Sequence, residues 1–140
     1  MSFKRKTILI TGASQGLGAM VAENLSKLGP KLILVSSSEL KLKKTLNKCQ
    51  NKKNHRFISC DFQNINDIKI TTNFIKKNYS KIDILMHFAG GGLGIKNPLP
   101  EFSDYLKVFQ LNFFSILELN RNLLSHLKKS KNPTIFHVGS

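Results

Sequence analysis

Apolar positions along this chain follow two different periods in turn. Short runs of β-branched and aliphatic residues predict five strands, at 7–10, 31–35, 56–60, 82–88 and 134–138. Between these runs, apolar residues recur at the three- and four-residue spacing of one helix face, and they predict four helices, at about 17–28, 39–49, 65–75 and 102–127. Strands that alternate with helices are typical of an α/β domain with a parallel sheet.

Details of this pattern indicate how the elements begin, end and connect. The predicted buried face of the first helix consists of Leu17, Val21, Leu25 and Leu28. Gly29-Pro30 should end that helix, and Ser36 and Glu39 have the spacing of a capping box at the start of the next one. The connections are long enough for right-handed crossovers, so we expect a doubly wound sheet in three layers.

The composition narrows the class of protein. With 140 residues, of which 41% are apolar and 21% charged, the chain is long enough for one domain, 1–140, and too apolar to be disordered. Its longest uncharged apolar stretch, at 108–117, is far shorter than the ~20 residues of a membrane-spanning helix. No signal peptide precedes the first strand, so we expect a cytoplasmic protein. Cys49 and Cys60 lack metal-ligand spacing, and we expect reduced structural thiols and no metal site.

The net charge of +14 raises the question of a nucleic-acid partner. Of the 22 basic residues, 19 are lysines, and along the sequence they are spread over every predicted surface rather than gathered on one element. An AT-rich genome also enriches Lys, Ile and Asn at exposed positions without any ligand. We therefore expect neither a nucleic-acid nor a membrane partner.

A glycine-rich turn follows the first predicted strand and opens the first predicted helix. Gly12, Gly16 and Gly18 lie in the run TGASQGLG at 11–18, with the spacing GxxxGxG. Glycine lets the backbone approach a ligand closely, and the N–H groups and positive dipole end of a helix N-terminus attract phosphate. This context predicts a site for the pyrophosphate of a dinucleotide. The alternative is a turn that only lets the helix pack on the strand.

The run at 11–18 resembles the cofactor motif TGxxxGxG of the short-chain dehydrogenase/reductase family, and the resemblance extends over the whole chain. It implies a Rossmann-like sheet with the strand order 3-2-1-4-5, from which the C-terminal strands are missing, so that 1–140 would be an incomplete NAD(P)-binding domain. The residues that it assigns to the cofactor are Gly12, Ser14, Gln15, Gly16, Leu17, Gly18, Ser36, Ser37, Asp61, Phe62, Ala89 and Gly90.

Two of these assignments rest on strand ends. Asp61 follows the third predicted strand, where the family has an aspartate beside the adenine ring, although a turn aspartate that ends the strand is the alternative. Ala89-Gly90 matches the second half of the family's NNAG motif. His87 and Phe88 stand in place of the two asparagines, which in the family supply hydrogen bonds that stabilise the sheet.

Two further positions resemble catalytic residues of the family. Asn112 matches the asparagine whose backbone carbonyl holds a water of the proton relay, with a purely structural asparagine as the alternative. An amide among apolar neighbours needs a partner in either case, because an unpaired buried amide costs ~1–3 kcal/mol. Ser140, at the end of the last predicted strand, matches the serine that binds the substrate oxygen.

The family's YxxxK motif, in which a lysine lowers the pKa of the proton-transferring tyrosine, does not occur in these residues. Tyr79 and Tyr105 are followed four residues later by Asp83 and Phe109. Either the chain is a fragment of a longer reductase, or it is the product of a truncated gene. The end of the sequence on an apolar strand favours a fragment.

The choice between the two nicotinamide cofactors depends on the end of the second strand. NAD-preferring folds carry an acidic residue there, which binds the ribose 2′-hydroxyl. This chain has Ser36-Ser37-Ser38 instead, whose hydroxyls can donate to a 2′-phosphate, with Lys41 or Lys43 close in sequence. Gln15 stands where many NADP-dependent members carry an arginine. We expect a weak preference for NADP over NAD.

Together these assignments predict an NAD(P)-dependent oxidoreductase that transfers hydride between nicotinamide and a small carbonyl or secondary alcohol substrate. A non-catalytic dinucleotide-binding module, or a decayed and truncated reductase, is the alternative. By resemblance, the full-length form should be a homo-oligomer, a dimer or tetramer, paired through the long helix. The apolar residues that would form this contact on the helix are Phe102, Leu106, Phe109, Phe113, Leu117 and Leu124. The alternative for this helix is packing wholly within its own sheet.

Overall fold

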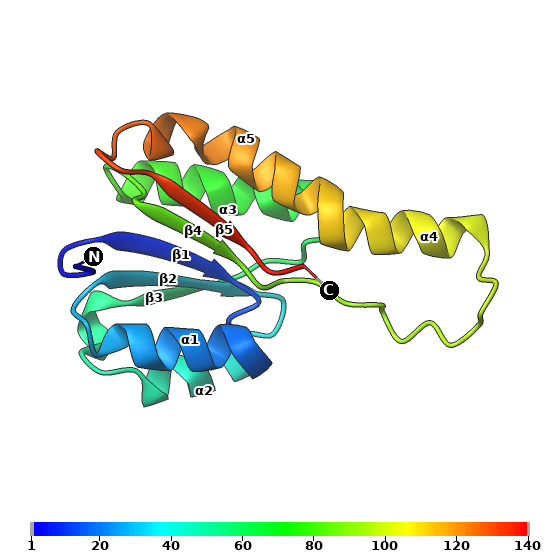
Figure 1. Cartoon of the computed structure of the whole chain (residues 1–140), viewed down its shortest axis with the longest axis horizontal. Helices are drawn as coiled ribbons and strands as arrows, with labels where there is room; N and C mark the ends of the chain where they lie inside the picture. The colour runs from blue at the N-terminus through cyan, green and yellow to red at the C-terminus, as the bar shows by residue number, and fades with distance from the viewer. Residues whose placement is uncertain (1, 140) are drawn as a thin grey trace.

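Five parallel strands form one sheet in the computed structural model, which describes residues 2–139. The strands are β1 (Thr7–Thr11), β2 (Lys31–Ser36), β3 (Arg56–Ser59), β4 (Ile84–His87) and β5 (Thr134–His137). Their order is β3-β2-β1-β4-β5, and every neighbouring pair is parallel. The predicted α/β class, the doubly wound topology and the strand order are therefore confirmed (Figure 1).

Helices cover both faces of this sheet and complete three layers (Figure 1). On one face lie α1 (Gly16–Ser26) and α2 (Glu39–Lys48), and on the other lie α3 (Ile65–Asn78) and α5 (Ser115–Leu127). α4 (Phe102–Phe109) extends beyond the carboxyl ends of the strands and continues into α5 through a wide π-helical turn, η2 (Gln110–Phe114). A short 3-10 turn, η1 (Lys52–Asn54), precedes β3. Within residues 2–139, none of the helices is long and apolar enough to cross a membrane.

Apolar side chains of alternating direction along the strands build one core on each face of the sheet. Leu9 and Ile33 belong to the cluster that contains Leu119 of α5. Ile10 belongs to the cluster that contains Ala22 of α1. All five side chains are fully buried, and burying one aliphatic side chain stabilises a fold by ~1.5–3 kcal/mol. Cys49 and Cys60 are buried and form no disulfide.

The face that α1 buries differs from the predicted one. Leu17 and Leu28 are each 52% exposed, whereas Gly18, Ala19 and Ala22 face the sheet. The reason is close packing, because a Cβ at position 18 would overlap the carbonyl of Gly12 at the end of β1. Leu25 is buried and Val21 packs against the core as predicted, so these two residues and the small ones, rather than Leu17 and Leu28, mark the buried side of this helix.

The start of α2 also differs from the prediction. Ser38 is the N-cap residue, and its hydroxyl accepts a hydrogen bond from the backbone N–H of Lys41 at 3.4 Å. Ser36 instead ends β2, and its hydroxyl donates to the hydroxyl of Ser14 at 2.8 Å. The predicted capping role of Ser36 is therefore wrong, because the strand continues through that residue and leaves it beside the glycine-rich turn.

The long predicted helix is present, but its apolar residues are on the outside. Phe102 is 74% exposed, and the other predicted apolar residues of this helix are 47–54% exposed. The face that packs on the sheet is formed by Leu119, Leu123 and Leu127. Packing of the whole helix within its own sheet, one of the two alternatives drawn from the sequence, is therefore wrong.

A buried carboxylate ties three strands together at the end where they begin. Asp83 is fully buried, and it accepts hydrogen bonds from the hydroxyl of Ser130 at 2.6 Å, the ammonium of Lys81 at 2.8 Å and the N–H of Thr7 at 2.9 Å. Burial by itself would raise the pKa of Asp83, but these donors outweigh it and lower the pKa below the ordinary value. The carboxylate is therefore ionised and bonded through both oxygens.

Candidate functional site

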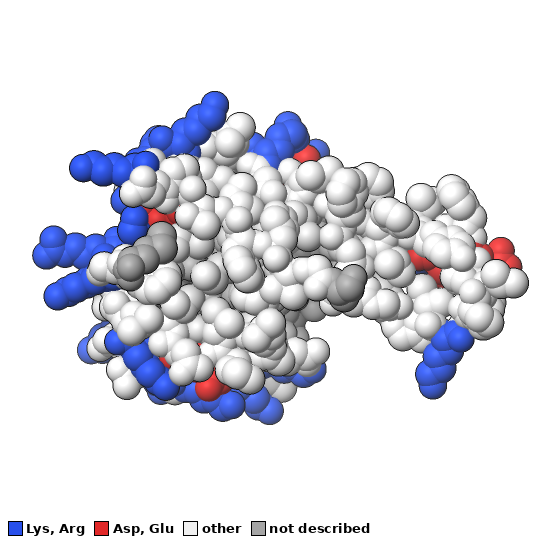
Figure 2. Space-filling model, in the orientation of Figure 1, with Lys and Arg blue, Asp and Glu red and all other residues white. Residues whose placement is uncertain are grey.

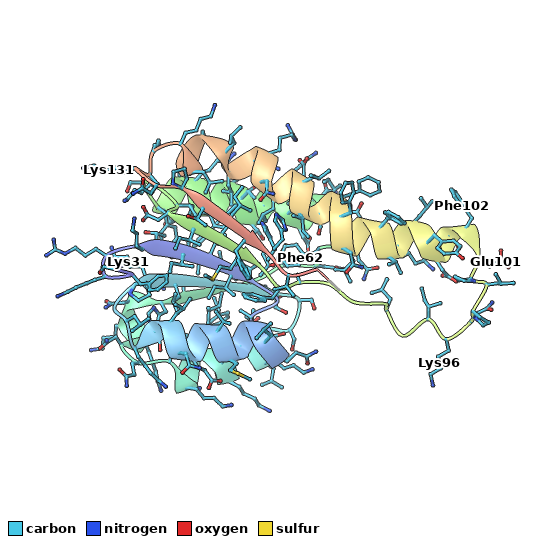
Figure 3. All side chains as sticks on the ribbon, in the orientation of Figure 1. Lys31, Phe62, Lys96, Glu101, Phe102 and Lys131 are labelled. Carbon is cyan, nitrogen blue, oxygen red and sulfur yellow. The ribbon has the colours of Figure 1, made fainter. Side chains whose placement is uncertain are left out.

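One cavity at the carboxyl ends of the strands gathers the predicted cofactor residues. Its volume is about 460 Å³. All twelve of them line it, from the ends of four strands and from the beginning of α1: Gly12, Ser14, Gln15, Gly16, Leu17, Gly18, Ser36, Ser37, Asp61, Phe62, Ala89 and Gly90. Figure 3 labels one of these residues, Phe62, at this end of the sheet. Residues up to 78 positions apart in sequence thus meet around one space, although their roles toward a cofactor stay predictions.

Glycine is required at different positions of the turn at 11–18 for different structural reasons. A Cβ on Gly12, whose φ is +66°, would lie 2.6 Å from the backbone of Phe88 and Ala89. Gly16 has a φ of +56° and faces open space, so that its backbone borders the cavity without a side chain. No side chain caps the start of α1 at Gln15. The first N–H groups of α1 are therefore available to an anion in the cavity.

Serines and one lysine form the wall of the cavity beside α2. The paired hydroxyls of Ser36 and Ser14 lie on this side, and Ser37 is exposed next to them. The ammonium of Lys41 donates to the side-chain oxygen of Gln15 at 2.7 Å, which holds this cation over the cavity. Ser38 and Lys41 line the cavity but were not assigned to the cofactor from the sequence, in which only the nearness of Lys41 to the second strand pointed to this position.

Asp61 serves as a turn residue and also faces the cavity. Its carboxylate accepts the N–H of Gln63 at 2.9 Å, which is the strand-ending turn named as the alternative. The side chain is exposed and lines the same cavity as Phe62, which is only 6% exposed. The two interpretations of Asp61 are therefore compatible in space.

Asn112 clamps the glycine-rich segment that follows β4. Its amide nitrogen donates to the carbonyl oxygens of Val108 at 2.8 Å and Gly91 at 2.9 Å, and its amide oxygen accepts the N–H of Gly91 at 2.8 Å. A Cβ on Gly90 would lie 2.6 Å from that amide oxygen. The hydrogen-bond partner expected for this side chain is thus the backbone. The catalytic role of Asn112 stays a prediction.

A second cavity, of about 700 Å³, lies on the Asn112 side of the first. The two share the same four lining residues, Phe88, Ala89, Gly90 and Val138. Sequence reasoning missed Val138, because an apolar residue in a predicted strand carries no signal of a site. Ser140, the other predicted catalytic residue, lies outside the described residues.

His87 supplies contacts at the position where the family motif has an asparagine. It is 2% exposed, its ring stacks on that of His137 at 4.6 Å between centroids, and Nε2 lies 2.9 Å from Oδ1 of Asn120. Burial lowers the pKa of His87 to about 4, so the ring is neutral at pH 7 and donates its Nε2–H to Asn120. Nδ1 is buried without a partner among the described residues.

The hydroxyl of Thr11 provides the remaining hydrogen bonds at this sheet end. It accepts the backbone N–H groups of Phe88 and Ala89, both at 3.2 Å. The end of β4 is therefore tied to β1 by Thr11 and to α5 by His87. Although His87 and Phe88 replace the two asparagines of the family's NNAG motif, hydrogen bonds of Thr11 and His87 still connect β4 to its neighbours at this end of the sheet.

Comparisons with known proteins agree with this architecture. The family model described as short chain dehydrogenase matches residues 6–140. The 3-oxoacyl-[acyl-carrier-protein] reductase FabG of Buchnera aphidicola is 32% identical over 143 residues, which cover 100% of this chain and 57% of the relative.

Solved structures show the same likeness. A structure from Escherichia coli CFT073, assigned to the short chain dehydrogenases and complexed with NADPH, is 25% identical with a TM-score of 0.87, over 99% of this chain and 60% of its own. NADH-dependent reductase A1-R′ complexed with NAD is 26% identical with a TM-score of 0.84, over 99% of this chain and 60% of its own. The chain spans about half the length of the curated relatives it matches. With the fold, the glycine-rich turn and the family match in agreement, the chain belongs to the short chain dehydrogenase family.

Proposed function

We propose that the chain binds NAD(P) in the cavity at the carboxyl ends of its strands, as part of an oxidoreductase that acts on a carbonyl or secondary alcohol. The observation that carries the proposal is the convergence of the twelve predicted residues on one cavity that also borders the uncapped start of α1. A Cβ at Gly12 would collide with the backbone beside this cavity, so the turn is shaped for close backbone approach.

Each part of the cavity has its own task in this proposal. The N–H groups of Gly16 and Leu17 bind the pyrophosphate, because the helix N-terminus is electropositive and presents unbonded donors. Asp61 and Phe62 border the adenine, and Ala89-Gly90 flanks the nicotinamide half. The bound dinucleotide supplies the hydride chemistry.

Asn112 contributes by holding the backbone of Gly91, which lines the second cavity next to the shared residues Ala89 and Gly90. Ser140 would hydrogen-bond the substrate oxygen and favour the negative charge that develops there during reduction. Tyr79 and Tyr105 cannot supply the proton as members of a YxxxK motif, because neither is followed by lysine at the fourth position. The proton donor of the complete reaction must come from another group.

The same proposal assigns NADP as the preferred cofactor. No carboxylate stands at 36–38 at the end of β2 to repel a 2′-phosphate, and Lys41 lines this wall of the cavity together with Ser36 and Ser37. The two similar structures described above hold different nicotinamides, so the preference is argued from this chain's own residues.

Calorimetric titration of the purified chain with NADPH and with NADH tests both the dinucleotide site and the preference for NADP. We expect NADPH to bind more tightly, and Lys41→Gln to weaken NADPH about tenfold or more with little change for NADH, since a hydrogen bond to a charged group contributes ~1.5–3 kcal/mol. Lys43→Gln is the matched control, because Lys43 pairs with Glu39 on the same helix. A tenfold preference for NADH would overturn the NADP assignment, and absence of binding of both would overturn the dinucleotide site.

The alternative function is a dinucleotide-binding module without catalysis. Sequencing the transcript beyond codon 140 separates the two: an in-frame YxxxK supports the oxidoreductase, and a stop codon supports the module. We also propose homo-oligomerisation through the exposed apolar side of α4 and α5, which sedimentation of the full-length protein would test.

A further inference from the structure

The fold gathers basic residues that the sequence spreads out, and this removes the reason given above against a nucleic-acid partner. In a parallel sheet with crossover helices, every segment that leads into a strand lies at the same end of the sheet. In this chain those segments are 4–6, 27–31, 48–56, 76–81 and 128–131, and they contain 15 of the 22 Lys and Arg residues. We call these five segments the basic pole. Figure 2 shows Lys and Arg side chains clustered at this end, opposite α4, and Lys31 and Lys131 are labelled there in Figure 3.

Little negative charge compensates the basic pole. None of the eight acidic residues of the chain lies in its five segments. The buried carboxylate of Asp83 pairs with Lys6 and Lys81, and Glu23 pairs with Lys48. The other twelve basic residues of the pole form no ion pair with any residue from 2 to 139. Their charge is therefore available to a partner.

Helix stability explains only part of this arrangement. α1, α2, α3 and α5 all end at the pole, and basic residues in a last turn stabilise the helix dipole. This effect accounts for Lys48, Lys76 and Lys77. It does not account for Lys31, the first residue of β2, or for Lys131 in the loop before β5, which belong to no helix.

The chemistry of the pole favours an extended polyanion as its partner. The pole contributes nothing to either cavity of the candidate site, so its charge has no role in holding a ligand there. In its segments, the only exposed large apolar side chain is that of Leu28. A membrane surface held by lysines alone would lack the apolar insertion that stable anchoring needs. A protein interface would lack the apolar and aromatic anchors that dominate binding energy.

A nucleic-acid duplex matches the pole in size and charge. Five strands about 4.8 Å apart span roughly 19 Å. A duplex carries one charge per ~1.7 Å of its axis, so a length of roughly 19 Å holds about 11 phosphates in its two strands, of which those on one side face the pole. We propose that the basic pole binds the phosphate backbone of a double-stranded nucleic acid without reading its sequence, at the opposite end of the sheet from the dinucleotide cavity.

Fluorescence anisotropy of a labelled random-sequence duplex, titrated with the full chain at several salt concentrations, tests this proposal. We expect the logarithm of the association constant to fall linearly with the logarithm of the salt concentration. A variant with Lys4, Lys31, Lys129 and Lys131 each changed to Gln should bind about tenfold more weakly or worse. Its salt slope should fall by about 3 to 4, because each phosphate that is no longer neutralised lowers the slope by about 0.9.

The matched control changes Lys43, Lys69, Lys96 and Lys107 to Gln, which gives the same net charge with an intact pole. This control should lose less than about twofold, since the phosphates that the protein neutralises, rather than its net charge, set the salt slope. Equal losses in both variants would overturn the proposal, as would binding to phosphatidylserine vesicles without binding to the duplex. Thermal unfolding of each variant shows that the fold is intact, independently of any cofactor.

Discussion

The two ends of strand β4 carry buried polar groups that are satisfied to different degrees. Asp83, immediately before the strand, is bonded to donors from β1, from the loop before β5 and from its own neighbour Lys81. His87, the last residue of the strand, has one ring nitrogen bonded and one without a partner among the described residues. One group is held as an ion by its partners, and the other is held neutral by burial.

The difference separates a structural end of the sheet from an adjustable one. A carboxylate that accepts three hydrogen bonds ties the start of β4 to β1 and to the loop before β5. A neutral imidazole with a spare acceptor contributes less to stability and responds to protons. The satisfied group lies at the end far from the cavity, and the unsatisfied group lies at the end beside it.

Removal of the Asp83 carboxylate should give the largest effect on stability. Asp83→Ala leaves the buried hydroxyl of Ser130 and the N–H of Thr7 without an acceptor, and breaking a buried pair costs about 3 kcal/mol or more. For a chain of this size, that loss lowers the melting temperature by roughly 10 °C. Calorimetry of the variant checks it. Asp83→Asn, which keeps an acceptor, should cost less, and a melting temperature unchanged in both would show that the carboxylate does not lock the strands.

The pH dependence of stability should reveal the next largest effect, at His87. Its pKa is lowered from 6.5 to about 4 in the fold, so between these values the unfolded chain binds more protons than the native one. Stability therefore falls as the pH drops from 6.5 toward 4, by up to about 1.4 kcal/mol per pH unit, and this contribution is fully lost below pH 4. Denaturant unfolding at a series of pH values measures the slope.

A variant isolates this slope from other titrations. Burial also lowers the pKa of His55, which adds a contribution of the same sign. In His87→Asn the part that belongs to His87 should disappear while the part from His55 remains. The same slope in wild type and variant would contradict the neutral, buried state of His87.

An exposed ion pair should have the smallest effect on stability, and it provides a reference for the effects at the buried Asp83 and His87. Arg121 donates two hydrogen bonds to the carboxylate of Glu118 on α5 and lowers the pKa of that carboxyl to about 2. Arg121 is exposed, so water and salt screen the pair, and Arg121→Ala should leave the midpoint of denaturant unfolding nearly unchanged. A loss of stability as large as that of Asp83→Ala would show that burial does not explain the strength of the hydrogen bonds to Asp83.

The sequence predicted the strands and the cavity well because both depend on local signals. Residues at strand ends meet at one edge of a parallel sheet whatever the details of packing, so the positions of Asp61, Ala89 and Gly90 followed from the strand assignments alone. The predictions that were wrong depend on contacts between residues that are distant in the sequence. Leu17 and Leu28 have helical spacing but face solvent, because the close approach of α1 to Gly12 selects smaller residues for the buried side.

Other features had no signal that a single sequence could give. The clustering of basic residues required the topology, since segments 27–31 and 128–131 are about a hundred residues apart. The partner of Asn112 was expected but not identified, because a backbone group has no identity in the sequence. The stacking of His87 on His137 depends on the register of β4 against β5.

The wide turn between α4 and α5 has a consequence for how this protein can vary. A π-helical turn holds one residue more than the α-helix around it, and here Asn112 and Ser115 bond the carbonyl oxygens of Val108 and Leu111. Deleting one residue from 110–114 would restore regular winding and rotate α4 by about 100° about its axis relative to α5. The amide would then turn away from Gly91. Insertions and deletions are therefore restricted in a helix whose exposed surface would otherwise tolerate them.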